Sequence, residues 1–423
     1  MIDEKLRRRI CNQVERSAAA TIEDIRTLVR IPSLVGQEGA AQDFIADRFR
    51  NLGLELDVFE ADRAVVSRHP AYTEVEWGYE GRPNVVGILR GRDHGRSLAM
   101  NGHVDVVSPE PLAGWTHDPW GGEREGNRLY GRGALDMKAG AIANIYAVKA
   151  LLDLGLRPKG AVILHSVIEE EAGGGGGTLA TLLRGHTAEA LWIPEPLDMS
   201  LVLAHPGVNY FRVRLQGKTA HAGQSHYGIN AIGLAARIYD RLVALDRERA
   251  SQFRDPFFEQ WTDRAINLNV GTMRAGDWVS SVAGWAEISC RISYIPPETE
   301  AQMRASVARA VQEVADADPW LGEHPPEIEW FGWHAEPWAQ DLTSPFVNLC
   351  REVVTDVVGT PPREMASTAG LDNRFASYFG MQSVCYGPRG ERPHGPDECV
   401  ELDSVLDVTK VAACLIAAWC GVG

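Results

Sequence analysis

Acidic and histidine side chains follow several of the apolar runs in this sequence, and the first of these places is His103-Val104-Asp105. In an extended strand, residues two apart project to the same side, so His103 and Asp105 are expected to project together. An imidazole that binds a metal usually needs a partner on its other ring nitrogen, and a nearby carboxylate suits that need. Taken alone, the pair is also typical of a buried histidine without a ligand.

Two further acidic places have unusual neighbours. Asp136 lies among glycines in Gly131-Arg132-Gly133-Ala134-Leu135-Asp136-Met137-Lys138-Ala139-Gly140, directly before a predicted helix. The glycines allow a close backbone approach, although Asp136 could also simply cap the helix. Glu169-Glu170-Glu171 follows an apolar strand. Three successive carboxylates repel one another unless a cation or a proton is present, and the alternative is an exposed acidic loop.

The last two places are Glu195, held between Pro194 and Pro196, and His394, in a loop with acids behind it. Two histidines with several carboxylates suit zinc, with cobalt or manganese as substitutes. Two metals roughly 3.5–4 Å apart need a bridging carboxylate and can share one water as hydroxide. A free carboxylate beside that water would act as general base and then protonate a leaving amine. The residue types therefore predict a hydrolase in which metal ions activate the attacking water.

In this order and spacing, the blocks GHVDVV, GRGALDMKAG, EEEAGG, PEP and PHGPDE resemble the metallohydrolase family of acetylornithine deacetylase, succinyl-diaminopimelate desuccinylase, aminoacylase and carboxypeptidase G. The resemblance covers nearly the whole chain. It implies two zinc ions, with Asp105 orienting a histidine ligand and Glu170 as general base, although the register among the three glutamates stays open. The implied ligands are His103 and Glu195 for one metal, Glu171 and His394 for the other, and Asp136 bridging both.

Three further residues are assigned by the same resemblance. Gly217-Lys218-Thr219-Ala220-His221-Ala222-Gly223 is similar to the family's lid motif, in which the histidine reaches across a dimer to the oxyanion, so His221 is the candidate for that role. A surface histidine is the alternative. Arg374, in Thr368-Ala369-Gly370-Leu371-Asp372-Asn373-Arg374-Phe375, can grip a substrate carboxylate with two hydrogen bonds. Asn269 is a candidate for a polar substrate contact or a turn residue.

The elements that must hold these residues form two patterns. Predicted strands at 54–59, 84–90, 97–107, 161–167 and 190–193 alternate with predicted helices at 3–30, 40–53 and 138–154. This alternation predicts a central, mostly parallel sheet covered by helices, a zinc-exopeptidase-like α/β catalytic domain by the resemblance. Residues 206–334 instead predict strand–helix–strand–strand–helix–strand, a ferredoxin-like α+β unit. We expect it to interrupt the catalytic domain (1–205 and 335–423) as a dimerisation or lid domain.

The bulk properties restrict partners and compartment. The net charge of −15, without a compensating basic cluster, argues against nucleic-acid binding. Seven widely spaced cysteines without a CxxC pair are typical of a reducing compartment. The first residues lack the apolar core of a signal peptide, and no apolar run reaches the roughly 20 residues of a membrane span. We therefore expect a cytoplasmic protein that forms a homodimer through the inserted domain.

These observations together predict a metal-dependent amidohydrolase, a deacylase acting on a small N-acylated amino acid or a related carboxylate-bearing compound. Two alternatives share the chemistry: a dipeptidase or carboxypeptidase-type exopeptidase, and an amidohydrolase of a heteroaromatic or formyl amide. A third, a binding module without catalysis, would be expected to lack one of the ligands, and all of the ligand types are present.

Overall fold

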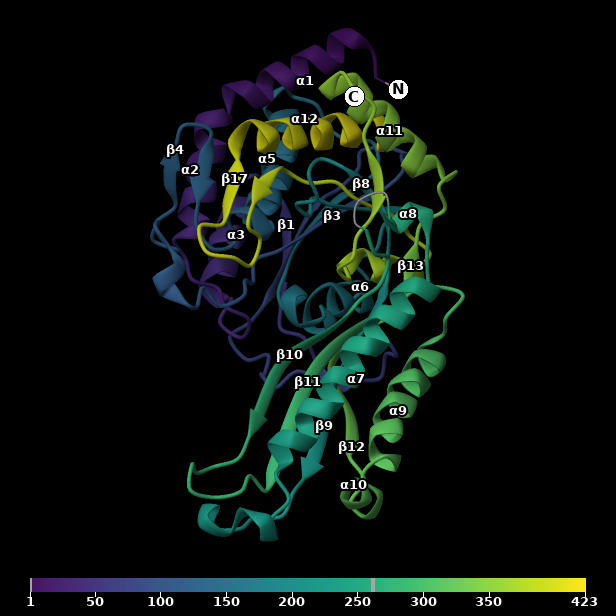
Figure 1. The fold of residues 1–423 in the computed structure, drawn as a ribbon. Coiled ribbons are helices and arrows are strands. Elements are labelled where there is room, and N and C mark those ends of the chain that lie inside the picture. Colours follow the sequence, from purple (N-terminus) through teal and green to yellow (C-terminus); the bar gives the residue numbers. More distant parts are fainter. Residues whose placement is uncertain (1, 260–262) are drawn as a thin grey trace. The chain divides into compact units, whose positions relative to one another are not determined.

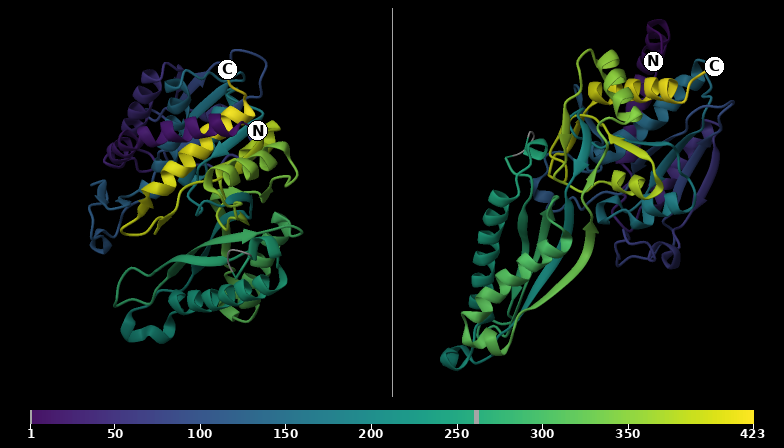
Figure 2. Two further views of the ribbon diagram at one scale, coloured as in Figure 1. Left: turned by 90° about the horizontal axis from the view of Figure 1, so that it is seen from above. Right: turned by 90° about the vertical axis from the view of Figure 1, so that its right-hand side faces the viewer.

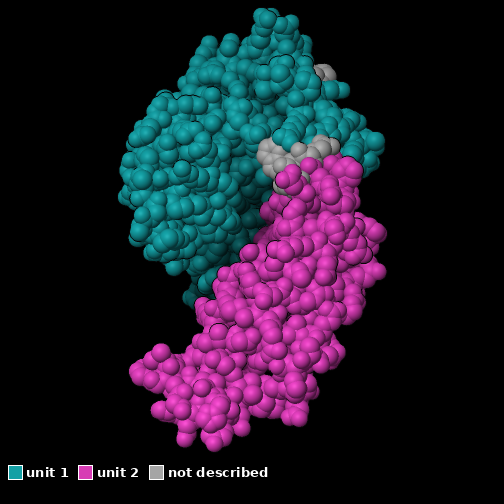
Figure 3. Space-filling view, in the orientation of Figure 1, with its two compact units in different colours: residues 1–203, 339–365, 371–423 teal, residues 204–338, 366–370 magenta. Residues whose placement is uncertain are grey.

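The computed structural model describes residues 2–259 and 263–423. It divides into two compact units, which Figure 3 colours separately. Unit 1 comprises residues 1–203, 339–365 and 371–423, and unit 2 comprises residues 204–338 and 366–370. The short segment 366–370 was expected in the catalytic domain, but its contacts belong to unit 2. In the described residues, no helix is both long and apolar enough to cross a membrane.

The large sheet has nine strands, and its centre is parallel (Figure 1). β6, β3, β7 and β15 pair in parallel, whereas β1, β2 and β8 pair antiparallel with their neighbours. The predicted mostly parallel central sheet is therefore confirmed, with antiparallel strands toward its edges. The order is β1 (Glu55–Phe59), β2 (Asn84–Leu89), β6 (Val162–Val167), β3 (Leu98–His103), β7 (Ala190–Ile193), β15 (Gln382–Cys385), β8 (Leu201–His205), β13 (Trp338–Ala339), with β14 (Glu364–Ala366) beside β8.

Helices pack on these strands because their apolar sides need cover. α5 packs on β3, α3 packs on β2, and α12 packs against α5, α11 and α1. The single helix expected over residues 3–30 is two helices, separated at Ser17, whose hydroxyl donates to the Gln13 carbonyl and competes with the regular ladder. The helices of unit 1 are α1 (Glu4–Arg16), α2 (Ala18–Val29), α3 (Gly39–Asn51), α4 (Arg63–Val66), α5 (Ala139–Asp153), α6 (Ala180–Leu183), α11 (Pro345–Val358) and α12 (Leu402–Trp419).

A small antiparallel sheet was not predicted, because its strands are only two or three residues long. Its order is β16 (Gly390–Glu391), β17 (Cys399–Glu401), β5 (Arg128–Tyr130) and β4 (Glu123–Glu125). Cys399 pairs with Tyr130 between β17 and β5. This pairing joins the chain just before Asp136 to the chain just after His394, although more than 250 residues separate them in sequence.

Unit 2 has a four-stranded antiparallel sheet with the two long helices on one face (Figures 1 and 2). Apart from two additional short helices, the element order is the predicted strand–helix–strand–strand–helix–strand. Its elements are β9 (Gly207–Gln216), α7 (Ala231–Gln252), α8 (Pro256–Glu259), β10 (Leu268–Ala275), β11 (Trp285–Tyr294), α9 (Glu300–Asp316), α10 (Pro319–Glu323) and β12 (Glu327–Ala335), in sheet order β10-β11-β9-β12.

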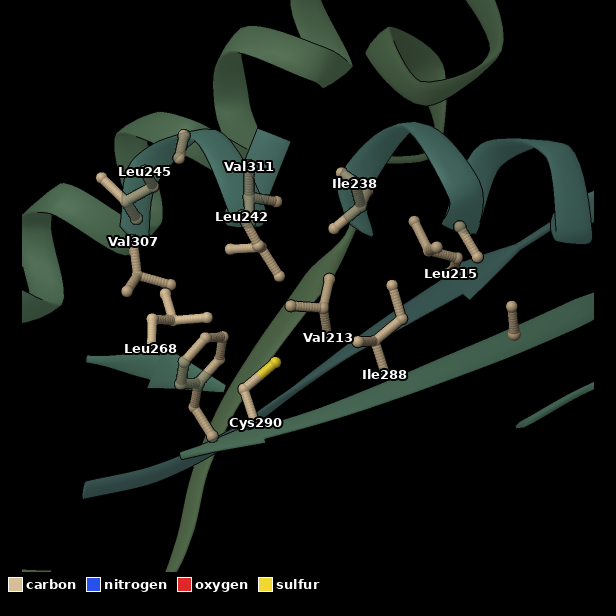
Figure 4. Packing of buried hydrophobic residues seen from close by; sticks show 14 of the residues in the cluster. Val213, Leu215, Ile238, Leu242, Leu245, Leu268, Ile288, Cys290, Val307 and Val311 are labelled. Atoms are coloured by element: carbon tan, nitrogen blue, oxygen red, sulfur yellow. The ribbon is translucent and has the colours of Figure 1, made fainter. Parts of the chain in front are cut away.

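The core of unit 2 lies between that sheet and its helices. Figure 4 shows Leu242 of α7 and Val311 of α9 packed with Val213 and Ile288 of the strands. Alternate strand residues are buried in this core, as the alternating sequence predicted. Burying each such side chain contributes about 1.5–3 kcal/mol, so unit 2 has an apolar core of its own.

Candidate metal centre

Four predicted site residues come directly from neighbouring parallel strands. His103 is the last residue of β3, Glu170 and Glu171 follow β6, and Glu195 follows β7. β3 pairs in parallel with both β6 and β7. The carboxyl ends of these strands therefore meet at one edge of the sheet, where α/β proteins bind ligands.

Asp136 and His394 reach the same place from loops. Asp136 lies in the segment Ala134–Lys138, whose backbone is not helical at Asp136. The N-cap of α5 is Lys138, so the alternative that Asp136 caps this helix is wrong. His394 lies between β16 and β17 with a φ of 62°. The glycines of the Asp136 motif do allow close approach, since a Cβ on Gly140 would lie 2.4 Å from the Pro194 carbonyl oxygen beside Glu195.

The structure brings these residues together as two groups that share Asp136. We call His103, Asp136 and Glu195 the inner group, and Asp136, Glu171 and His394 the outer group. Within each group, one ligand atom per residue lies within 4.8 Å of the others. All five of the predicted metal ligands are therefore in one cluster within unit 1.

Asp136 faces both imidazoles with different oxygens. Its Oδ1 lies 3.2 Å from Nε2 of His103, and its Oδ2 lies 3.4 Å from Nε2 of His394. Each imidazole also faces a second carboxylate, Glu195 at 3.6 Å from His103 and Glu171 at 3.1 Å from His394. Asp136 thus has the geometry of a bridging carboxylate between two cation sites.

Asp105 contacts His103 differently from the expected way. The atom at hydrogen-bond distance from Nδ1 of His103 is the Asp105 carbonyl oxygen at 2.9 Å, whereas the nearer carboxylate oxygen is 3.6 Å away. The strand ends at His103, so the two-residue periodicity no longer directs Asp105. The carboxylate instead accepts the backbone N–H groups of Glu170 and Glu171, at 3.2 and 3.1 Å. Asp105 therefore contacts both the imidazole and the acidic loop.

The three successive glutamates have different surroundings, so the acidic loop is not an exposed one. Glu169 is fully buried, accepts a hydrogen bond from the Gly176 N–H and lies 3.5 Å from Arg82. Glu171 faces His394 in the outer group. Glu170 is 8% exposed and belongs to neither group. The geometry thus matches the register in which Glu171 is a ligand and Glu170 is free for another task.

Burial and like charges act on the carboxylates of this cluster. Burial raises the pKa of Glu170 well above its ordinary value, and the nearby Asp372 and Glu195 add to the effect. Burial likewise raises the pKa of Glu195, opposed by His103. Burial also raises the pKa of Asp105 to about 7. Such a concentration of buried acids is costly unless positive charge accompanies it.

At the two imidazoles and at Asp136, the surroundings instead favour the charged form, which raises the pKa of each histidine and lowers the pKa of Asp136. Burial disfavours a charged His103, but Glu195 and Asp136 more than offset this and raise its pKa well above the ordinary value. Hydrogen bonds with Asp136 and Glu171 raise the pKa of His394 to about 10. Burial opposes ionisation of Asp136, yet the hydrogen bonds with both histidines lower its pKa. Each imidazole therefore lies where a cation is favoured.

The residues present fit a pair of metal ions. Oε1 of Glu195 is buried and has no hydrogen-bond partner among the described residues, as expected for a carboxylate oxygen that binds a cation. Imidazole nitrogen and carboxylate oxygen are the donors that zinc, cobalt and manganese accept. The inner and outer groups each offer one nitrogen and two carboxylates.

Sequence reasoning gave no role to Arg132, Glu398 or Asp372. Arg132 and Glu398 form a buried ion pair, and Glu398 accepts a hydrogen bond from the Asp136 N–H. Asp372 is buried and accepts the Thr178 hydroxyl. All three lie inside motifs that had been recognised, so the motifs marked the right segments without showing which side chains turn toward the cluster.

Arg374 has a contact that was not foreseen. Its side chain is buried, and its Nη2 donates to the Gly173 carbonyl at 2.7 Å, at the end of the acidic loop. This contact favours a role in holding the loop. Binding of a substrate carboxylate by Arg374 stays a prediction.

His221 and Asn269 belong to unit 2. His221 is exposed, and its Nδ1 accepts the Gly223 N–H at 3.1 Å. Asn269 is exposed on β10 and pairs across the sheet with Arg291, whose guanidinium donates to Asn267 and to the Thr368 carbonyl. The roles expected of His221 and Asn269 stay predictions, and Asn269 lies in a strand rather than in a turn.

Comparison with known proteins gives consistent results. The family model described as Peptidase family M20/M25/M40 matches residues 99–418. The chain is 27% identical, over 96% of both chains, to N-formyl-4-amino-5-aminomethyl-2-methylpyrimidine deformylase of Bacillus subtilis. It is 29% identical to succinyl-diaminopimelate desuccinylase of Cereibacter sphaeroides, over 89% of this chain and 93% of that protein. A dinuclear metal-binding peptidase of the M20 family from Bacillus subtilis shares the fold, with a TM-score of 0.63, 16% identity and coverage of 96% and 99%.

Proposed function

Because this chain belongs to peptidase family M20/M25/M40, we propose that it is a metal-dependent amidohydrolase that removes an acyl group from the nitrogen of a small molecule. Relatives that match it over most of their length include a deformylase and a desuccinylase, whose names describe removal of a formyl and a succinyl group. The observation that carries the proposal is Asp136, whose two oxygens face two separate imidazole–carboxylate groups. The favoured substrates are N-acylated amino acids and related carboxylate-bearing amides.

The proposed cofactor is a pair of zinc ions, with cobalt or manganese as possible substitutes. His103 and Glu195 would hold one ion, Glu171 and His394 the other, and Asp136 both. Bound there, the ions supply Lewis acidity, which polarises an amide carbonyl and makes a water molecule more acidic. The fold neighbour from Bacillus subtilis is described as a dinuclear metal-binding peptidase, which supports two ions rather than one.

The protein side chains would handle the protons and the geometry. Glu170 is buried beside the cluster without belonging to either group, so it can accept a proton from water and pass it to the departing nitrogen. Burial and the neighbouring acids raise its pKa, so this carboxyl takes up a proton more readily than an exposed glutamate does. Asp105 fixes the backbone of Glu170 and Glu171. In unit 2, His221 is proposed to stabilise the oxyanion, and Asn269 to contact the substrate.

A second candidate substrate class is favoured by one relative. The Bacillus subtilis deformylase, which is similar over 96% of both chains, is named for an N-formylated aminomethylpyrimidine. A formyl group on the amine of a heteroaromatic compound is therefore the main alternative to an N-acylated amino acid. Exopeptidase action on dipeptides is the third class to be tested, since the family model is named for peptidases.

The test is a hydrolysis screen read by mass spectrometry. Metal-free protein would be reconstituted with zinc, cobalt or manganese and offered N-formyl, N-acetyl and N-succinyl amino acids, an N-formyl aminomethylpyrimidine, and dipeptides. We expect metal-dependent release of an acyl group, and a Glu170→Gln variant reconstituted in the same way should turn over about 100- to 10,000-fold more slowly. Cleavage of dipeptides alone would replace the deacylase by an exopeptidase. Metal-independent turnover would refute the proposal.

Self-association through unit 2 is part of the proposal. β10 is an edge strand, and its side chain Met273 is 42% exposed. On α7, Ile232 and Tyr239 are 50% and 42% exposed. Unpaired strand edges and exposed apolar side chains favour association with a second chain. Sedimentation should give a dimer for the natural protein and a monomer for Ile232→Glu/Met273→Glu. The cytoplasmic location stays a prediction.

A further inference from the structure

Arg132 and Glu398 form a buried ion pair in unit 1 that contacts the backbone at Asp136 and at His394. Their side chains are 2% and 1% exposed, and Nη1 of Arg132 lies 2.5 Å from Oε2 of Glu398. Breaking or burying such a pair is costly, and a well-packed apolar pair of similar volume is often at least as stable. The charges are therefore poorly explained by stability alone, and their other contacts are informative.

The second oxygen of Glu398 holds the backbone at Asp136. Oε1 accepts the N–H groups of Leu135 and Asp136, each at 3.0 Å. These two N–H groups lie in a segment without regular helical bonding. Glu398 thus fixes the main chain from which the shared Asp136 carboxylate projects.

The other terminal nitrogen of the Arg132 guanidinium, Nη2, contacts the backbone at His394. Nη2 donates to the His394 carbonyl at 3.1 Å and, more weakly, to the Ser108 carbonyl at 3.4 Å. The guanidinium also lies over the Trp115 ring, 5.3 Å from its centroid. Because His394 has a left-handed φ, which few residues adopt without support, this contact fixes a backbone that local propensity does not favour.

We propose that Arg132 and Glu398 are a positioning pair that sets the spacing of the inner and outer groups. Glu398 holds Asp136, Arg132 holds His394, and their mutual ion pair makes the two loops a single unit. Neither side chain belongs to either group, so the pair acts through the ligands it holds. The inference rests on the proposed function in one respect, namely that the two groups bind metal.

Unit 2 offers a matched control. Arg249 and Glu298 are each 3% exposed and lie 2.5 Å apart, with Nη2 of Arg249 also donating to the Ser293 carbonyl. This pair matches the other in residue types, burial and separation. Neither of its residues belongs to the inner or outer group. Loss of a buried ion pair should therefore affect stability in both places, but metal binding in only one.

The experiment compares Glu398→Gln with Glu298→Gln and with Arg132→Lys, which keeps the charge but loses the two-armed fork. Metal-free proteins would be titrated with cobalt in competition with a chromophoric chelator, and the visible spectrum of the bound cobalt recorded. Glu398→Gln should weaken cobalt binding about 10- to 100-fold and change the spectrum, as typical for losing a hydrogen-bond partner of a metal ligand. Arg132→Lys should weaken it about tenfold. Glu298→Gln should lower the melting temperature without either effect.

Three results would overturn the inference while leaving the proposed function standing. One is that Glu398→Gln binds cobalt with the same affinity and the same visible spectrum as the natural protein. Another is an equal loss of cobalt binding in Glu298→Gln, which would indicate a general effect of destabilisation. Should Glu398→Gln fail to fold, Arg132→Lys decides, and unchanged cobalt binding in it refutes the pair's role. If the natural protein bound no cobalt at all, the proposed function would fail first, and the inference with it.

Discussion

The inner and outer groups share Asp136 but are built in different ways. His103 and Glu195 of the inner group are 1% and 3% exposed and come from the ends of paired parallel strands. In the outer group, the side chain of His394 is 51% exposed and comes from a loop. The inner group is thus fixed by the sheet, whereas the outer group depends on contacts between loops. We infer that one metal would be held firmly and the other would exchange more readily.

The largest effect is expected from Asp136→Ala, because this residue belongs to both groups. Losing it should remove one of the two carboxylates from each group and leave Glu170 with no activated water. Hydrolysis should fall by more than about 10,000-fold, beyond the range for losing a single general base. Metal analysis should show less than one ion per chain. A variant that still held two ions would show that the groups do not depend on a shared carboxylate.

The next effect is expected from Glu170→Gln, which lies in neither group. The side chain keeps its size but can no longer accept the proton, so kcat should fall about 100- to 10,000-fold. Metal content should stay at the natural value, in contrast to Asp136→Ala. If metal content fell together with kcat, Glu170 would be a ligand, and the register of the acidic loop would have to shift.

A smaller effect is expected at Asp105, which connects the two groups. Its carbonyl contacts His103 of the inner group, and its carboxylate holds the N–H groups of Glu170 and Glu171. Asp105→Ala removes only the carboxylate contacts, so the outer group should suffer more than the inner one. Activity should fall about 10- to 100-fold, with a change in the affinity of the weaker metal. Equal weakening of both metals would show that the outer group does not depend more strongly on the Asp105 carboxylate than the inner group does.

The smallest effect concerns the natural protein during metal removal. A chelator should remove one ion at least about tenfold more slowly than the other, because the inner ligands are buried and the outer histidine is exposed. His394→Ala should keep one firmly held ion, whereas His103→Ala should lose the slow phase. Release kinetics followed with a coloured chelator would show this. A single phase in the natural protein would contradict the expected difference in exchange rate between the two metals.

Much of the fold was predictable because it follows from periodicity. Apolar runs followed by helices predicted the central sheet, and alternation of apolar and polar residues predicted the four-stranded sheet of unit 2. The strands β4, β5, β16 and β17 were not predicted, since two or three residues carry no periodic signal. The break between α1 and α2 at Ser17 was not predicted either, because apolar residues occur with helical spacing on both sides of it.

The sequence by itself determined which residue types were available for the cluster and on which strands and loops they would lie. His103 lies within one strand that the apolar pattern predicts, and Glu171 and Glu195 follow two others, so their shared edge could be inferred from topology. Only the tertiary structure decided that Asp105 turns its carboxylate to the acidic loop, that Arg374 holds Gly173, and that Arg132 and Glu398 join the Asp136 and His394 loops. These contacts link residues that are between 65 and 266 positions apart, and no local pattern specifies them.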